Sequence, residues 1–135
     1  EVKGELGERI VLHQGDQTKR EDLTGFMSAS YFDLIVDDGG HTMEQQQVTL
    51  ATLFPYVRPG GFYILEDLHT SFLPDFGVEP DGKNATITVI EQLADHKPVV
   101  SKYMTDEERA YLSANVESVH IYGKKSMTSI IRKKR

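Results

Sequence analysis

The pattern of apolar and polar residues along the chain predicts short strands and helices that alternate. Two short apolar runs, at residues 33–37 and 62–66, are typical of strands buried on both faces, as in the parallel sheets of α/β proteins. Short connections and the lack of an internal repeat indicate α/β architecture. The other predicted elements are a first strand at 9–13, helices at 19–27, 42–57, 86–95 and 106–114, a long loop at 68–83, and a closing hairpin of strands at 116–122 and 127–132.

The predicted helix at 42–57 has its apolar residues at helical spacing, which indicates one buried face. Gln45, Gln46 and Gln47 would then form its wetter side. Thr18 is placed to cap the first predicted helix.

Composition narrows the class of protein. With 135 residues and 39% hydrophobic content the chain can bury one core, so we expect a single domain over residues 1–135. No apolar run approaches the ~20 residues that cross a bilayer, and cysteine is absent, so we expect a cytoplasmic protein without membrane contact. The net charge of -6 argues against a nucleic-acid partner, and we interpret the basic residues 132–135 as a solvated tail.

Acidic residues follow both apolar runs. Asp37 and Asp38 come at the end of the first run, and Glu66 and Asp67 come at the end of the second. Ligands bind to parallel α/β sheets at the carboxyl ends of the strands, so these side chains are expected to converge on one crevice. Because Mg²⁺ prefers hard oxygen ligands, Asp38, Glu66 and Asp67 are the candidate metal ligands.

A histidine completes the candidate site. His41 lies in the turn after Asp38, and an imidazole with a pKa near ~6.5 is available in its neutral form at physiological pH. Proton removal from an alcohol requires a base and a cation that stabilises the alkoxide, so we expect His41 to be the catalytic base.

Each of these residues has a structural alternative. Asp37 or Asp38 could cap the helix at 42–57, and Glu66 with Asp67 could be a solvated strand end. His41 could be an ordinary turn residue. Two acidic clusters on neighbouring strands favour the metal site over these alternatives.

Several motifs together resemble one known family. They are Asp37-Asp38-Gly39-Gly40-His41, Leu53-Phe54-Pro55, Arg58-Pro59-Gly60-Gly61 and Ile64-Leu65-Glu66-Asp67-Leu68-His69-Thr70-Ser71. This combination resembles the magnesium-dependent sugar O-methyltransferases of macrolide biosynthesis and their cephalosporin-hydroxylase-like relatives, a subfamily of class I S-adenosylmethionine-dependent methyltransferases. The similarity runs from about Arg9 to Thr70 and weakens into topology alone beyond that.

The resemblance implies a fold and a reaction. The fold would be a three-layer α/β/α Rossmann-like methyltransferase sandwich, with a mostly parallel sheet and an antiparallel hairpin at its carboxyl end. The reaction would be methyl transfer from S-adenosylmethionine to a hydroxyl of a small molecule or sugar, with Mg²⁺ as the second cofactor. In this family the positions of Asp38, Glu66, Asp67 and His41 have the roles inferred above.

The resemblance also implies contacts to the methyl donor. Gly15-Asp16-Gln17 follows the predicted first strand, where an acidic or amide residue commonly binds the adenine of the donor in methyltransferases. Asp16, Gln17 and Asp37 are therefore the candidate cofactor-binding residues. The alternative for Gly15 and Asp16 is an ordinary turn.

The chain departs from the family pattern at its amino-terminal side. The glycine-rich loop that holds the donor's methionine end, the acidic strand end for its ribose and the strands around them are missing. We therefore expect the carboxy-terminal portion of a methyltransferase catalytic domain, with weak or no donor binding of its own. The open edge of the strand at 33–37 would be closed by the strand at 9–13, or would pair with another chain in a homo-oligomer.

Two other functions are compatible with carboxylates at the ends of strands. One is a receiver-like module that accepts a phosphoryl group, and the other is a non-catalytic interaction module. A receiver needs a lysine beyond a later strand, whereas here that strand ends in Glu66 and Asp67, so the spacing disfavours this alternative.

Overall fold

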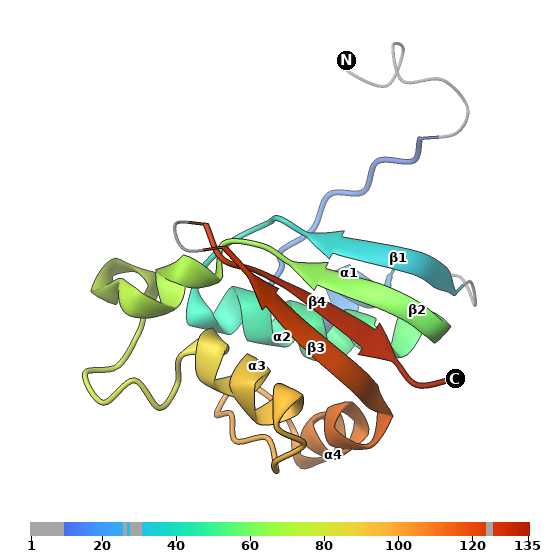
Figure 1. The fold of residues 1–135 in the computed structure, drawn as a ribbon. Coiled ribbons are helices and arrows are strands. Elements are labelled where there is room, and N and C mark those ends of the chain that lie inside the picture. The colour runs from blue at the N-terminus through green and yellow to red at the C-terminus, as the bar shows by residue number, and fades with distance from the viewer. Residues whose placement is uncertain (1–9, 26, 28–30, 124–125) are drawn as a thin grey trace.

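The computed structural model describes residues 10–25, 27, 31–123 and 126–135. Its strands form one mixed sheet in the order β1-β2-β4-β3 (Figure 1). The pair β1 and β2 is parallel, and the two other pairs are antiparallel. The strands are β1 (Phe32–Asp37), β2 (Val57–Leu65), β3 (Val116–Tyr122) and β4 (Thr128–Lys133), and the helices are α1 (Arg20–Thr24), α2 (Met43–Leu53), α3 (Thr86–Ala94) and α4 (Asp106–Asn115).

Most predicted elements are confirmed, with small shifts at their ends. The predicted helix at 42–57 divides into α2, the 3-10 turn η2 (Phe54–Tyr56) and the start of β2. The predicted loop at 68–83 contains two more 3-10 turns, η3 (Leu68–Phe72) and η4 (Pro74–Phe76). Within the described residues, no helix has the length and apolar character needed to span a membrane.

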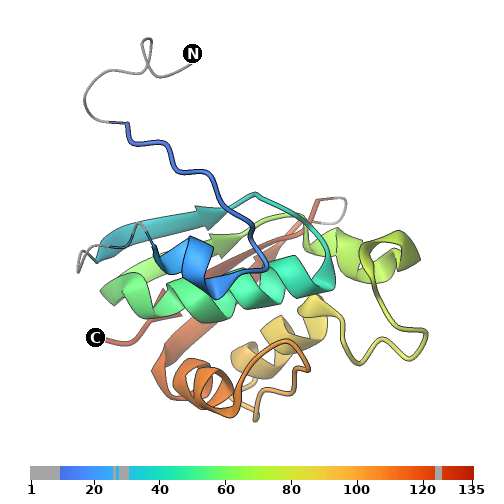
Figure 2. The same cartoon turned by 180° about the vertical axis from the view of Figure 1, so that it is seen from behind.

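Helices cover one face of the sheet in the described part of the chain (Figure 1 and Figure 2). Helix α2 lies at the centre of this layer and contacts β1, β2 and the three other helices. The α/β class is confirmed, and the described residues supply two layers of the predicted sandwich, the sheet and one helical layer. The described sheet is mixed, with two of its three strand pairs antiparallel, and not mostly parallel as predicted.

None of the described residues forms a layer over the opposite face of the sheet, so the prediction that β1 is buried on both sides was wrong. Leu34 and Val36 are 49% and 52% exposed, and Phe62 on β2 is 40% exposed. The register places Leu34 opposite Phe62 and Val36 opposite Ile64, so these apolar side chains share one face. An apolar run indicates that a strand could be buried on both faces. Whether it is buried depends on other segments of the fold that pack over each face of the sheet.

The predicted first strand at 9–13 was also wrong where the structure describes it. Residues 10–13 form no strand, and Ile10, Val11 and Leu12 are exposed. Arg9 lies outside the described residues. The segment leads away from the body of the domain (Figure 1), so it does not close the edge of β1. Apolar residues in an extended segment do not make a strand unless a partner strand accepts their backbone hydrogen bonds.

Thr18 does not cap α1, contrary to the prediction. The N-cap is Lys19, which makes no side-chain cap hydrogen bond. The Thr18 hydroxyl instead donates to Asp16 Oδ1 at 2.8 Å, and the Thr18 amide donates to the same oxygen at 2.9 Å. Thr18 therefore forms hydrogen bonds within the turn that precedes α1 and does not cap the helix.

The predicted wetter side of α2 is buried at two of its three positions. Gln46 and Gln47 are 1% and 0% exposed. Gln47 Nε2 donates to the Asn84 carbonyl at 2.8 Å, and Gln47 Oε1 accepts from the Ser101 hydroxyl at 2.6 Å. Gln46 Nε2 donates to the Glu66 carbonyl at 3.2 Å. Helix α2 is enclosed on several sides, so its amide side chains bind buried polar groups of the neighbouring segments instead of water.

An ion pair connects α1 to α4 and holds the amino-terminal segment against the domain. Arg20 Nε and Nη2 donate to the two carboxylate oxygens of Glu108 at 2.6 and 2.8 Å, and Nη2 also donates to the Tyr103 carbonyl at 2.8 Å. Partial burial raises the pKa of Glu108, but the hydrogen bonds from Arg20 and the Thr105 amide, together with the charge of Arg20, leave this pKa below its ordinary value.

Replacing Arg20 with glutamine should lower the free energy of unfolding by about 1 kcal/mol at neutral pH, because the pair is partly exposed and screened. The folded-state pKa of Glu108 lies below the unfolded value of 4.5, so the pair stabilises the fold above that pH and loses this contribution as the pH falls through the folded-state pKa. Urea unfolding of wild type and Arg20→Gln at about pH 7 and about pH 3 should show the difference shrinking in acid. Lys97→Gln, at an exposed pair with Asp95, is the control, and a difference independent of pH would contradict the prediction.

Candidate metal site

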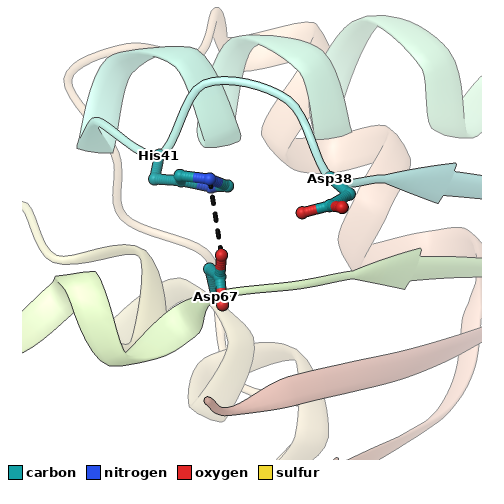
Figure 3. Close-up of side chains that lie close together, drawn as sticks. All are labelled: Asp38, His41 and Asp67. Atoms are coloured by element: carbon teal, nitrogen blue, oxygen red, sulfur yellow. Dashed lines mark ion pairs between the residues drawn. The ribbon is translucent and has the colours of Figure 1, made fainter.

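The parallel pairing of β1 and β2 brings two acidic strand ends together. In the register of this pair Asp37 lies opposite Leu65, so Asp38 and Asp67 follow the two strands at the same edge of the sheet. Asp38, His41 and Asp67 each offer one ligand atom, and these atoms lie within 4.8 Å of one another (Figure 3). His41 Nε2 is 3.4 Å from Asp67 Oδ2. Three of the four residues predicted as metal ligands and base therefore meet in the structure.

Glu66, the remaining predicted ligand, is not part of this group. Its backbone amide donates to the Asp37 carbonyl at 3.0 Å and so continues the pairing of β1 and β2 by one residue. Glu66 ends the extended pairing, whereas Asp67 has a left-handed backbone, so the two side chains leave the chain in different directions. A role for Glu66 in metal binding stays a prediction.

Asp37 is buried and has hydrogen-bond donors on both carboxylate oxygens. The Tyr63 hydroxyl donates to Oδ2 at 2.7 Å, and Gln17 Nε2 donates to Oδ1 at 2.9 Å. Burial raises the pKa of Asp37, and hydrogen bonds from Tyr63, the Gly39 amide and Gln17 partly offset this rise. Burial and the neighbouring Asp37 carboxylate also raise the pKa of Tyr63 well above its ordinary value. Sequence reasoning missed Tyr63, since no spacing pattern links it to Asp37.

Gln17 connects the amino-terminal segment to the loop after β1. Besides its bond to Asp37, its Oε1 accepts from the Gly40 amide at 2.5 Å. A Cβ at Gly39 would lie 2.7 Å from the same oxygen, so a larger residue there would displace the Gln17 side chain. Gln17 thereby shapes the loop that carries Asp38 and His41.

Asp16, the third residue predicted to contact the methyl donor, directs its carboxylate to Thr18 and Lys19 and not to the pair of Gln17 and Asp37. It is exposed, and hydrogen bonds from the amide and then the hydroxyl of Thr18 lower its pKa. The structure therefore brings together two of the three predicted donor contacts. Their role toward the donor stays a prediction.

Helix α2 is capped by Thr42, so the alternative in which Asp37 or Asp38 caps this helix was wrong. The Gln45 amide donates to Thr42 Oγ1 at 3.2 Å, and the Thr42 amide donates to Gln45 Oε1 at 3.2 Å, which is a capping box. A Cβ at Gly40 would overlap the Gln45 side chain. A larger residue at this position would displace the cap, so the glycine pair allows the tight turn that presents His41.

The two loops of the site are joined through Thr70, which sequence reasoning did not single out. Its buried hydroxyl lies 3.0 Å from the His41 carbonyl and 2.9 Å from the Asp67 carbonyl. Asp67 itself has a left-handed backbone, with φ 54° and ψ 36°. This conformation is uncommon outside glycine and is tolerated by aspartate, and here it turns the carboxylate toward the loop after β1.

The donor set fits a hard divalent cation. The carboxylates of Asp38 and Asp67 lie together where β1 and β2 end, and water and a substrate oxygen could complete the coordination of a cation there, with the His41 imidazole beside them. The same geometry places an imidazole nitrogen within 4.8 Å of both carboxylates. Metal binding and proton transfer are therefore both within the chemistry of this site.

The fold is that of an α/β domain, and the proteins to which the chain is similar are methyltransferases. Mycinamicin VI 2''-O-methyltransferase from Micromonospora griseorubida is 34% identical over 122 residues, which cover 84% of this chain and 30% of the relative. Demethylmacrocin O-methyltransferase from Streptomyces fradiae is 33% identical over 123 residues, which cover 85% of this chain and 30% of the relative. The chain thus spans about a third of the length of these relatives.

The solved structures agree with the sequence comparison. MycE methyltransferase from the mycinamycin biosynthetic pathway, in complex with Mg, SAH and mycinamycin VI, matches with a TM-score of 0.72 and 29% identity over 90% of this chain and 31% of that chain. No protein-family model matches the chain. The chain is therefore a homologue of the macrolide-sugar O-methyltransferases and has their fold, which confirms the predicted resemblance. The comparisons support this interpretation over a receiver-like or interaction module.

Replacing Tyr63 with phenylalanine should lower the free energy of unfolding by about 1–3 kcal/mol, because the buried Asp37 carboxylate loses a donor. Urea unfolding at neutral pH measures the change. Tyr122→Phe, at a position 56% exposed on β3, is the matched control and should stay within about 0.5 kcal/mol of wild type. Equal effects of the two substitutions would show that the Tyr63 hydroxyl does not support Asp37.

Proposed function

We propose that this chain supplies the metal-binding and acceptor-activating part of an S-adenosylmethionine-dependent, magnesium-assisted O-methyltransferase. The observation that carries the proposal is the convergence of Asp38, His41 and Asp67 within 4.8 Å. The acceptor is a hydroxyl of a small molecule, and we propose a sugar hydroxyl because the relatives are named for methylation of glycosylated natural products.

Asp38 and Asp67 would hold Mg²⁺, with Glu66 as the predicted third carboxylate. When bound, the cation supplies stabilisation of the alkoxide that forms as the acceptor hydroxyl loses its proton. His41 is the proposed base, and it accepts that proton at Nε2, the nitrogen that faces Asp67. The Asp67 carboxylate, 3.4 Å away, then stabilises the imidazolium.

The donor site is the second part of the proposal. Gln17 and Asp37 meet directly beside the loop that carries Asp38 and His41, and this supports a methyl donor bound next to the cation. Asp16 is retained as a proposed contact on the same segment. The cytoplasmic location expected from the sequence stays a prediction.

Isothermal titration with Mg²⁺ tests the metal site without requiring methyl transfer. The chain freed of metal by chelation should bind Mg²⁺, and Asp38→Ala and Asp67→Ala should each weaken binding at least about tenfold, because each removes a charged ligand. Asp75→Ala, an exposed aspartate in η4, controls for loss of charge and should bind like wild type. Equal binding by all four proteins would reject the proposed ligands.

We further propose that two copies associate through β1. This strand has no partner on its outer side within the described residues, and its exposed face carries Leu34 and Val36. Such an edge is a template for pairing with a second chain.

Light scattering after gel filtration, over a range of concentrations, tests the association. Wild type should show a dimer that dissociates on dilution, and Leu34→Lys should stay monomeric because a charge beside the edge opposes pairing. Val100→Lys changes a residue 63% exposed in the segment after α3 and should dimerise like wild type. A monomeric wild type at all concentrations would exclude the association.

A further inference from the structure

The two carboxylate oxygens of Asp67 have different surroundings. Oδ2 faces His41 Nε2 at 3.4 Å, on the side of the candidate metal site. Oδ1 accepts a hydrogen bond of 2.5 Å from the hydroxyl of Ser126. Oδ1 also lies 3.6 Å from His69 Nδ1, which is too long for a hydrogen bond, so Ser126 is the close donor.

Ser126 is separated from Asp67 by 59 residues and lies just before β4. The residues that follow it along the chain are held by backbone pairing on both sides of Asp67. The Leu68 amide donates to the Met127 carbonyl at 2.7 Å, and Leu65 pairs with Ser129 in the antiparallel register of β2 and β4. The hydroxyl is therefore presented by the sheet itself.

Asp67 lies where the chain leaves β2, so strand geometry does not fix the direction of its side chain. The residue is half-buried at the end of β2, and its left-handed backbone breaks the alternation of the strand. A hydrogen bond from a hydroxyl to a carboxylate is short and strong, and it selects one rotation of the carboxylate. The bond to Ser126 occupies Oδ1 and leaves Oδ2 directed at the site.

We propose that Ser126 is a positioning residue of the metal site, which holds Asp67 Oδ1 and so presents Oδ2 to the cation. This inference rests on the proposed function, since it requires Asp67 to be a metal ligand. Partners that orient a ligand in this way typically change metal affinity 10–100-fold when they are removed. The residue lies far from both acidic motifs in the sequence, and nothing in its local pattern indicates this role.

Binding of Mn²⁺, followed by the electron paramagnetic resonance signal of the free ion, tests the proposal, with Mg²⁺ as competitor. Ser126→Ala should raise the dissociation constant for Mn²⁺ about tenfold or more. Ser126→Cys should weaken binding similarly, because a thiol is a poor donor of almost the same size. Ser126→Thr retains the hydroxyl and should restore affinity to within about twofold of wild type. Ser113→Ala, at an exposed position of α4, is the matched control and should bind like wild type.

The outcomes separate this inference from the proposed function. A wild-type chain that binds no Mn²⁺ would overturn the metal site and the role of Ser126 together. Tight binding by both wild type and Ser126→Ala would overturn the role of Ser126 alone. Thermal unfolding of each variant is measured in parallel, and titrations are made well below the midpoint, so that a purely structural role would lower the midpoint and leave the dissociation constant unchanged. That result would also reject the proposal.

Discussion

The parallel pairing of β1 with β2 is the constraint on which the rest of the site depends. Asp38 and Asp67 are distant in the sequence, and they become neighbours because the two strands run in the same direction and end at the same edge. The continuation of this pairing by the bond between the Glu66 amide and the Asp37 carbonyl sets the register at that edge. A shift by one residue would exchange the faces of the strand and move the carboxylates apart.

Buried polar contacts then hold the loops in place around this edge. Tyr63 and Gln17 satisfy the Asp37 carboxylate, and Gln17 reaches on to the Gly40 amide. A buried network of this kind is favourable when each member has its partner, and it specifies one loop conformation. Asp37 thus contributes to the site by anchoring the loop, while its neighbour Asp38 lies with His41 and Asp67.

The exposed face of the sheet shows that an apolar run does not by itself predict burial of a strand on both faces. Leu34, Val36 and Phe62 have the hydrophobicity of a doubly buried strand, yet the described residues cover the sheet on its other face alone. Conversely, the polar residues Gln46 and Gln47 lie in the interior because their amides find partners there. Burial is decided by what packs against a residue, and that information is spread over the whole chain.

The sequence by itself determined the α/β class, most of the helices and strands, and the meeting of Asp38, His41 and Asp67, because these follow from periodicity, capping residues and the rule that parallel strands end at one edge. It also indicated the relation to the O-methyltransferases through local motifs. Only the tertiary structure decided which face of the sheet is covered, that Asp37 is held by Tyr63, and that Ser126 reaches Asp67. Tyr63 and Asp37 are 26 positions apart, and Ser126 and Asp67 are 59 positions apart. Such contacts arise only when distant segments pack together, so no local sequence pattern predicts them.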